Sequence, residues 1–161
     1  MTRAREAGLI GLLWLGVAAP AFADATAFIG ANTTPDNRQT RGLAGGRGLF
    51  VIVALEVEYA FTPDDPGSAV PSLKTGSANL LLQTPFAIRR VQPYLTTGGG
   101  FYSQTLGAHN EKGLALNSGG GVKISLAGPL RLRVDYRVFK LGNGALSSPA
   151  HRIYAGLNLK F

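Results

Sequence analysis

The residues from Leu130 to Val138 alternate strictly between apolar and polar side chains, and this pattern constrains the fold more than any other feature. In an extended chain, successive side chains point to opposite sides. The apolar side of this segment comprises Leu130, Leu132, Val134, Tyr136 and Val138. The polar side comprises Arg131, Arg133, Asp135 and Arg137. The segment is therefore predicted to be a β-strand that separates an apolar environment from a polar one.

The same period of two recurs along the chain. In the last segment, one face comprises Ile153, Ala155, Leu157, Leu159 and Phe161. The opposite face comprises Arg152, Tyr154, Asn158 and Lys160. Further strands are predicted from Leu49 to Phe61, from Leu73 to Thr84, from Val91 to Thr105 and from Leu114 to Leu126. In the segment that begins at Leu73, Leu81 is an exception because it falls on the polar side.

Two weaker strands are predicted nearer the N-terminus, from Ala25 to Thr34 and from Arg38 to Gly45. Pro35-Asp36-Asn37 favours a turn between them, and Gly45 to Gly48 favours a tight reversal after them. The strand count then reaches eight. An even count is typical of transmembrane barrels formed by one bacterial chain, with both termini in the periplasm.

The N-terminus has the pattern of a cleavable secretory signal. Arg3 and Arg5 precede an uncharged run that ends on the small-x-small triplet Ala21-Phe22-Ala23. This run is shorter than the roughly 20 residues that a membrane-spanning helix needs, and Pro20 interrupts it. We therefore expect a signal peptide over residues 1–23, cleaved before Asp24, and one barrel domain over residues 24–161.

A transmembrane β-barrel accounts for the rest of the composition. After the signal, no apolar run reaches helix-spanning length, so a membrane protein made from this chain must close its backbone hydrogen bonds in a barrel. The chain also has no cysteine, so disulfides and thiolate metal sites are excluded. The predicted fold class is all-β: an eight-stranded antiparallel up-and-down transmembrane β-barrel that follows a cleaved signal peptide.

The alternation alone leaves open a soluble, lipocalin-like barrel with its apolar face inside. Two features favour apolar faces toward lipid. The last strand ends on Phe161 with no helix after it, and a narrow eight-stranded lumen has no room for the bulky aliphatic side chains of every strand. With this assignment, a register shift of the strand Leu130–Val138 by one residue would turn three arginines toward lipid. Each would cost a free energy of about 2 to 4 kcal/mol near the membrane midplane.

The lengths of the predicted connections agree with this orientation, because such barrels have short periplasmic turns and longer external loops. The predicted periplasmic connections are Gly45 to Gly48, Pro85 to Arg90 and Ala127 to Pro129. The predicted external connections are Pro35 to Asn37, Thr62 to Pro71, Leu106 to Gly113 and Gly142 to Pro149. Apart from the first loop, every external connection is longer than every periplasmic one.

Several motifs resemble those of a known family. They are Asn79 to Pro85, Gln92-Pro93-Tyr94 with Gly98 to Gly100, Gly119 to Val122, Arg133 to Arg137, and the closing strand to Phe161. From about Leu49 onward, the chain resembles the small outer-membrane β-barrel proteins of the OmpA and OmpX type, often grouped as porin-family proteins. The resemblance implies that the outer-membrane insertion machinery reads the terminal strand, with Tyr154, Leu157, Leu159 and Phe161 as the insertion signal. The family has no single activity.

Charged side chains gather on the predicted interior faces. This lumen charge network comprises Glu56, Glu58, Lys123, Arg131, Arg133, Asp135, Arg137, Arg152 and Lys160. Two carboxylates two residues apart on a strand are separated by roughly 7 Å, which is compatible with acid–base catalysis in an open cleft. We favour a packed plug in which the acidic and basic groups pair, because an unpaired buried charge costs several kcal/mol.

The two histidines suggest an enzymatic alternative. His109 and His151 fall at or near the predicted external rim, close to Ser147, Ser148 and Glu111, and His151 is predicted to face lipid. A serine, a histidine and a carboxylate there could deacylate lipid A, as a barrel enzyme of similar size does. However, no local pattern places a serine and a histidine on one strand face, as a catalytic triad favours. No catalytic residue is assigned, and an enzyme is not expected.

Other ligand classes are disfavoured. The glycines between Gly42 and Gly48 are not followed by a helix that could bind phosphate, and Gly98 to Gly100 and Gly119 to Gly121 are interpreted as points of strand curvature. The formal net charge is +7, but the arginines recur at a period of two facing the lumen, so nucleic-acid binding is not expected. No metal or cofactor is expected.

Three functions remain. The favoured one is an integral protein of the cell outer membrane with a structural or surface-interaction role and a charge-plugged lumen. The alternatives are a small low-conductance channel and, third, a lipid A-modifying hydrolase at the outer rim. The expected partners are outer-membrane lipid and lipopolysaccharide and the barrel insertion machinery, and the extracellular partner stays unassigned.

Overall fold

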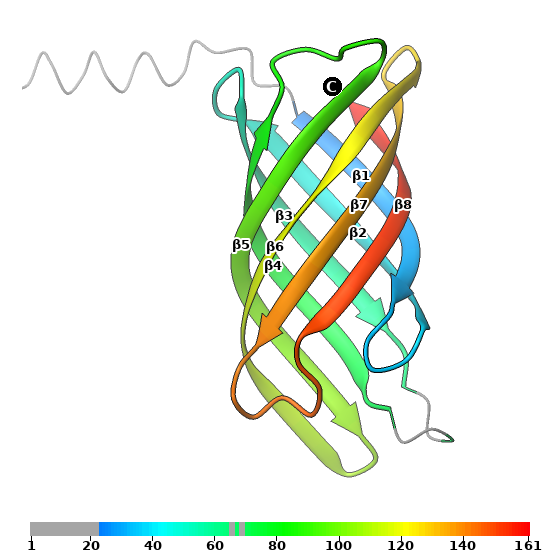
Figure 1. The fold of residues 1–161 in the computed structure, drawn as a ribbon, viewed down its shortest axis with the longest axis vertical. Helices are drawn as coiled ribbons and strands as arrows, with labels where there is room; N and C mark the ends of the chain where they lie inside the picture. Colours follow the sequence, from blue (N-terminus) through cyan, green and yellow to red (C-terminus); the bar gives the residue numbers. More distant parts are fainter. Residues whose placement is uncertain (1–22, 65–66, 68–69) are drawn as a thin grey trace, which may run out of the picture.

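A computed structural model describes residues 23–64, 67 and 70–161, which form a closed antiparallel β-barrel (Figure 1). Over these residues the strands are β1 (Ala23–Asn32), β2 (Arg38–Gly48), β3 (Val53–Thr62), β4 (Ser72–Gln83), β5 (Val91–Leu106), β6 (His109–Ala127), β7 (Leu130–Leu141) and β8 (Ala150–Lys160). Each strand pairs with the next along the chain, and β1 pairs with β8. The predicted fold class, strand number and up-and-down order are confirmed. The expected signal peptide, apart from Ala23, lies outside the described residues.

The seam between β1 and β8 closes the barrel. Its register runs from Asp24 opposite Lys160 to Asn32 opposite Arg152. Inside, the ring of Phe28 on β1 stacks on the ring of Tyr154 on β8, with centroids 4.0 Å apart. The beginning of β1 and the end of β8 lie at the same end of the barrel, which we call the terminal end (Figure 1). The opposite end is the distal end.

The two faces of each strand differ in polarity as the alternation predicts. On β3, Leu55, Val57 and Tyr59 are exposed on the outside, whereas Glu56 and Glu58 are buried inside. The same division holds on β5, β7 and β8. The apolar exterior is suited to contact with lipid. The closed sheet also leaves no open strand edge, as a membrane-spanning β-structure requires. Among the described residues, no helix is long and apolar enough to cross a membrane.

The prediction for the first terminal-end turn was wrong. Gly45 to Gly48 belong to β2, where they pair with Val57 to Ala54 of β3. The turn comprises residues 49–52, where the amides of Leu49 and Phe50 both donate to the carbonyl of Val53. The strand expected from Leu49 therefore begins at Val53. The glycines were predicted as a turn, but glycine is also compatible with an extended strand. The run of apolar side chains from Leu49 to Ile52 was predicted as a strand, because it resembles a buried strand in the sequence.

The predicted external loop from Leu106 to Gly113 was also wrong. β5 and β6 continue as a paired hairpin to Leu106 opposite His109, and the turn between them contains only Gly107 and Ala108. Gly107 has a positive φ of 57°, which suits glycine in a tight hairpin turn. The hairpin extends beyond the other strands at the distal end (Figure 1). The connections that were predicted to be external are thus not always longer than those at the terminal end.

Two smaller differences concern β1 and β4. β1 runs from Ala23 to Asn32, not from Ala25 to Thr34, because its pairing with β8 stops at Arg152. Leu81, which broke the alternation, is buried inside with Ala54 and Tyr94. It fills the terminal part of the lumen, where a larger polar side chain would need a partner.

Candidate functional site

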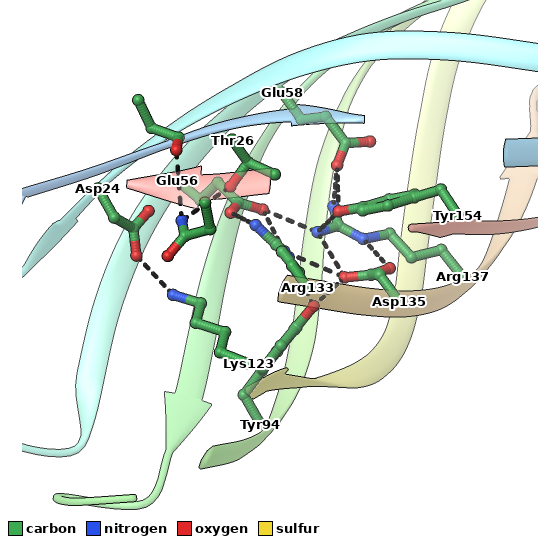
Figure 2. Close-up of polar contacts among 12 residues, drawn as sticks. Asp24, Thr26, Glu56, Glu58, Tyr94, Lys123, Arg133, Asp135, Arg137 and Tyr154 are labelled. Atoms are coloured by element: carbon green, nitrogen blue, oxygen red, sulfur yellow. Dashed lines mark hydrogen bonds and ion pairs between the residues drawn. The ribbon is translucent and has the colours of Figure 1, made fainter. Parts of the chain in front are cut away.

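A network of ion pairs fills the middle of the barrel (Figure 2). At its centre, the guanidinium of Arg133 on β7 donates to both carboxylate oxygens of Glu56 on β3. The same guanidinium donates to Asp135 at 3.0 Å and to the Tyr94 hydroxyl at 2.7 Å. Tyr94 in turn donates its hydroxyl hydrogen to Asp135. All four side chains are buried, so this part of the network is closed to solvent.

Arg137 extends the network toward the distal end. It donates to Glu56 at 2.7 Å and to Asp135 at 2.9 Å, and it forms an ion pair with Glu58 at 3.2 Å. The hydroxyl of Tyr154 donates a hydrogen bond of 3.1 Å to a carboxylate oxygen of Glu58. Each carboxylate therefore meets more than one donor, as buried charges require.

Arg152 forms the distal part of the network. Its guanidinium donates to Glu58 at 3.1 Å, to the hydroxyl of Thr75 at 2.9 Å and to the side-chain oxygen of Asn32 at 3.2 Å. The guanidinium also lies 4.4 Å from the centroid of the Phe139 ring. Its contacts thus connect β8 with β1, β3 and β4 across the lumen.

The network is balanced in formal charge. Within the described part of the chain it joins three carboxylates, of Glu56, Glu58 and Asp135, to three guanidiniums, of Arg133, Arg137 and Arg152. The carboxylates of Glu56 and Glu58 are buried and are held as acceptors for arginine, although Glu56 also lines a cavity at the terminal end of the lumen. This arrangement is suited to rigid packing and not to acid–base catalysis.

The remaining predicted charges lie nearer the terminal end. Lys123 is buried and forms an ion pair at 2.5 Å with Asp24 of β1. Arg131 donates to the side-chain oxygen of Gln92 at 3.1 Å. Arg131 and Lys160 line a cavity of about 160 Å³ together with Lys123 and Asp24. These three bases thus surround the lumen mouth and do not join the central network directly.

An apolar cluster packs inside the barrel on the distal side of Arg152. It comprises Leu73, Tyr102, Ala115, Phe139, Leu141 and Ala150, all buried. Above it, the side chain of Gln104 accepts from the amide of Leu146 at 2.8 Å and donates to the hydroxyl of Ser147 at 3.2 Å. The connection after β7 is thereby held over the barrel mouth. Polar pairs and apolar packing both occupy the lumen.

Glycines on β6 make room for the large side chains of the network. Gly121 lies between Tyr94 on β5 and Asp135 on β7. A Cβ atom there would lie 2.2 Å from the carbonyl oxygen of Val134 and 2.5 Å from the Tyr94 hydroxyl oxygen. Gly119 similarly lies against Arg137. The glycine run predicted as a curvature element therefore also provides the space that the charge network needs.

Some members of the site were not identified from the sequence. Asp24 was expected only as the first mature residue, although its alternation with Thr26 and Phe28 places it on the inward face. Tyr94 is predicted as part of the Gln92-Pro93-Tyr94 motif, and Tyr154 is predicted on a polar face, in both cases without a partner. The alternation indicates that such side chains point inward, but only the strand register shows which groups meet.

The residues of the enzymatic alternative are not brought together as a triad. Nδ1 of His151 is 2.7 Å from the hydroxyl of Tyr136 on the outside of the barrel. The hydroxyl of Ser147 accepts from Gln104, and that of Ser148 accepts from the amide of Leu141. His109 lies at the tip of the β5–β6 hairpin. Among the described residues, no group of three or more His, Asp or Glu side chains could hold a metal ion.

Comparison with known proteins gives similarity in structure only. No family model matches the sequence, and no curated protein matches it. The N-terminal β-barrel domain of Pseudomonas aeruginosa OprF has a TM-score of 0.64 at 16% identity, over 87% of this chain and 97% of that chain. Neisserial surface protein A has a TM-score of 0.62 at 18% identity, over 88% and 96%. Ail, the attachment invasion locus protein of Yersinia pestis, has a TM-score of 0.55 at 13% identity, over 88% and 98%. This chain therefore has the fold of the small outer-membrane β-barrels.

Proposed function

We propose that this protein is an integral outer-membrane protein with a structural or surface-interaction role, and that its barrel is a non-conducting scaffold. The observation that carries the proposal is the charge-balanced network around Arg133 and Arg137. An ion crossing the lumen would have to separate these pairs, and breaking one buried pair costs about 3 to 5 kcal/mol. The apolar cluster around Phe139 forms a second barrier. A small channel is therefore the less favoured function.

Conductance in a planar lipid bilayer tests the closed lumen. The folded protein is expected to give no steady single-channel current, with an open porin added to the same membrane to set the detection limit. Steady conductance from the wild-type protein would overturn the proposal and favour the channel. Brief, irregular current steps at the insertion of each barrel do not count as steady conductance.

The outer-membrane location is supported by the apolar exterior of the strands and by the fold. The test is separation of inner and outer membranes, followed by gel electrophoresis of boiled and unboiled samples. A folded barrel is expected in the outer-membrane fraction, with a mobility that changes on boiling. Recovery in the soluble periplasmic fraction would contradict the location.

Export and insertion form part of the same proposal. Cleavage before Asp24 would keep in the mature protein the Asp24 side chain that pairs with Lys123 in the barrel. Leu157 and Leu159 lie on the exposed outer face of β8, Phe161 is exposed directly after its end, and Tyr154 lies inside. N-terminal sequencing of the outer-membrane form is expected to begin at Asp24. Phe161→Ala is expected to reduce assembly in cells more than refolding in detergent, because only the cellular route uses an insertion signal.

The surface for interaction would be the β5–β6 hairpin and the connection at residues 142–149, which lie at the distal end. An epitope tag inserted between Gly107 and Ala108 is expected to bind antibody on intact cells. The same tag between Gly128 and Pro129, in the turn between β6 and β7, is expected to bind only after permeabilisation. The opposite result would reverse the proposed orientation.

A further inference from the structure

The outward faces of the strands carry basic side chains without acidic ones, over the strand residues that the structure describes. The outward basic residues are Arg41, Arg47, Lys74, Lys112 and Lys140. The strand carboxylates all occupy inward positions, and they are Asp24, Glu56, Glu58, Glu111 and Asp135. A lipid-facing cation costs about 2 to 4 kcal/mol near the bilayer midplane but only about 0 to 1 near the interface. The outward cations are therefore suited to the level of anionic headgroups.

Three of these cations form one row across neighbouring strands. Arg41 pairs with Phe61, Phe61 with Lys74, Lys74 with Ser103, and Ser103 with Lys112. We call Arg41, Lys74 and Lys112 the cation row. Successive cations are two strands apart, which corresponds to about 10 Å. Each lies within four residues of the distal end of its strand, so the row belongs to the outer half of the barrel.

The cation row borders apolar grooves on the barrel exterior. One groove of about 560 Å³ is lined by Ala27, Leu43, Tyr59 and Phe61, together with Arg41 and Lys74. A second groove of about 280 Å³ shares Tyr59 and Lys74 and adds Phe101 and Lys112. Nζ of Lys74 lies 5.6 Å from the centroid of the Phe61 ring, so its stem covers apolar surface while the ammonium stays accessible.

We infer that this surface binds a phosphorylated, multiply acylated glycolipid of the lipid A type. The inference rests on the proposed outer-membrane location. Acyl chains would occupy the two grooves, and phosphates would bind the cation row. A phospholipid with one phosphate and two chains matches one cation and one groove, whereas a glycolipid with two phosphates and several chains matches both grooves and the spacing of the row. The guanidinium of Arg41 also donates to Gln39 at 3.2 Å, which orients it without neutralising its charge.

Selective lipid retention tests this site. The full barrel would be refolded in phosphatidylcholine vesicles containing diphosphoryl lipid A, monophosphoryl lipid A or phosphatidylglycerol, and bound lipid would be measured by native mass spectrometry. The double variant Arg41→Gln/Lys74→Gln is compared with Arg47→Gln. Arg47 is a matched control because it lies on the outward face of β2 at the terminal end.

The wild-type barrel is expected to retain diphosphoryl lipid A in preference to both other lipids. Each basic side chain near a membrane surface contributes about a fivefold preference for anionic lipid, so the double variant should lose on the order of 25-fold. Arg47→Gln removes one cation outside the row, so it should lose at most about fivefold, and should lose it equally for diphosphoryl lipid A and phosphatidylglycerol. Lys74→Gln alone should lose about fivefold, and it decides the question if the double variant does not fold. The site would be overturned if wild type and variants retained diphosphoryl lipid A equally. It would also be overturned if the wild type retained phosphatidylglycerol as strongly as diphosphoryl lipid A. Failure of the wild type to show a heat-modifiable folded form in every vesicle would instead count against the membrane barrel.

Discussion

Glu56 and Arg133 are 77 residues apart in the sequence but are joined by two hydrogen bonds inside the barrel. Neither side chain reaches solvent. Their pairing connects β3 with β7 directly across the lumen, beyond the contacts that each strand makes with its neighbours. Buried pairs of this kind are sensitive to the loss of one partner, because the other charge then remains without compensation.

Glu56→Gln is expected to lower the free energy of unfolding by about 3 to 5 kcal/mol. The substitution keeps the shape of the side chain but leaves Arg133 and Arg137 without this carboxylate. Urea titration of the barrel in lipid vesicles, followed by circular dichroism, measures the change. The control Asp36→Asn, in an exposed turn, should change the value by less than about 0.5 kcal/mol. Equal stability of Glu56→Gln and wild type would mean that the pair contributes no net stability.

Tyr94→Phe is expected to destabilise the barrel by about 1 to 3 kcal/mol, because Arg133 and Asp135 each lose a buried hydrogen-bond partner. The same titration applies. Tyr136→Phe is the matched control, since its hydroxyl contacts His151 on the outside. If the two variants were equally stable, the hydroxyl of Tyr94 would have no structural role.

Gly121→Ala is expected to prevent or strongly destabilise the folded form. The added methyl group would lie 2.2 Å from a backbone oxygen of β7 and 2.5 Å from the Tyr94 hydroxyl, and a closed sheet offers little room to move away. Gly45→Ala is the control, because nothing lies within 4 Å of its added Cβ. The yield of heat-modifiable protein after refolding distinguishes them. Normal folding of Gly121→Ala would show that β6 can shift without loss of the network.

Val57→Arg is expected to reduce insertion into vesicles by a cost of about 2 to 4 kcal/mol. Val57 is 67% exposed on the outer face of β3, in the middle of the apolar band. His109→Arg adds the same charge at the hairpin tip, outside the band, and should insert like the wild type. Insertion is measured as the folded fraction across a series of urea concentrations. Equal insertion would contradict the assignment of the outer face to lipid.

Most of the fold could be predicted from the period-two pattern. In a membrane barrel, a polar side chain on the lipid face is strongly destabilising, so apolar and polar residues alternate along the strands. β7 and β8 are the clearest cases, since each inward charge is followed by an apolar residue on the outward face. The pattern failed where polarity stopped alternating. The apolar run before Val53 was wrongly predicted as strand. The polar run around Asn110 was wrongly predicted as loop, because a hairpin beyond the apolar band does not contact lipid and therefore needs no alternation of apolar and polar residues.

The alternation indicated which charged side chains point inward, but it did not indicate the apolar cluster around Phe139 or the contacts between the inward residues. Alternation placed Glu58 and Arg152 inside, yet their contact depends on the barrel's diameter and register, which the sequence does not display. The partner of Lys123 was missed for the same reason. Asp24 is 99 residues from Lys123, and the two meet only when the barrel closes.

The seam between β1 and β8 also bears on the timing of folding. Even the last residues of its ladder, Asn32 and Arg152, are 120 residues apart, so the seam cannot form while the chain is still emerging. Until β8 arrives, β1 presents an unpaired edge, and the ring of Phe28 has no Tyr154 to stack on. Such a chain must be kept from aggregating during transit, so its dependence on periplasmic chaperones would be greatest just before the last strand pairs.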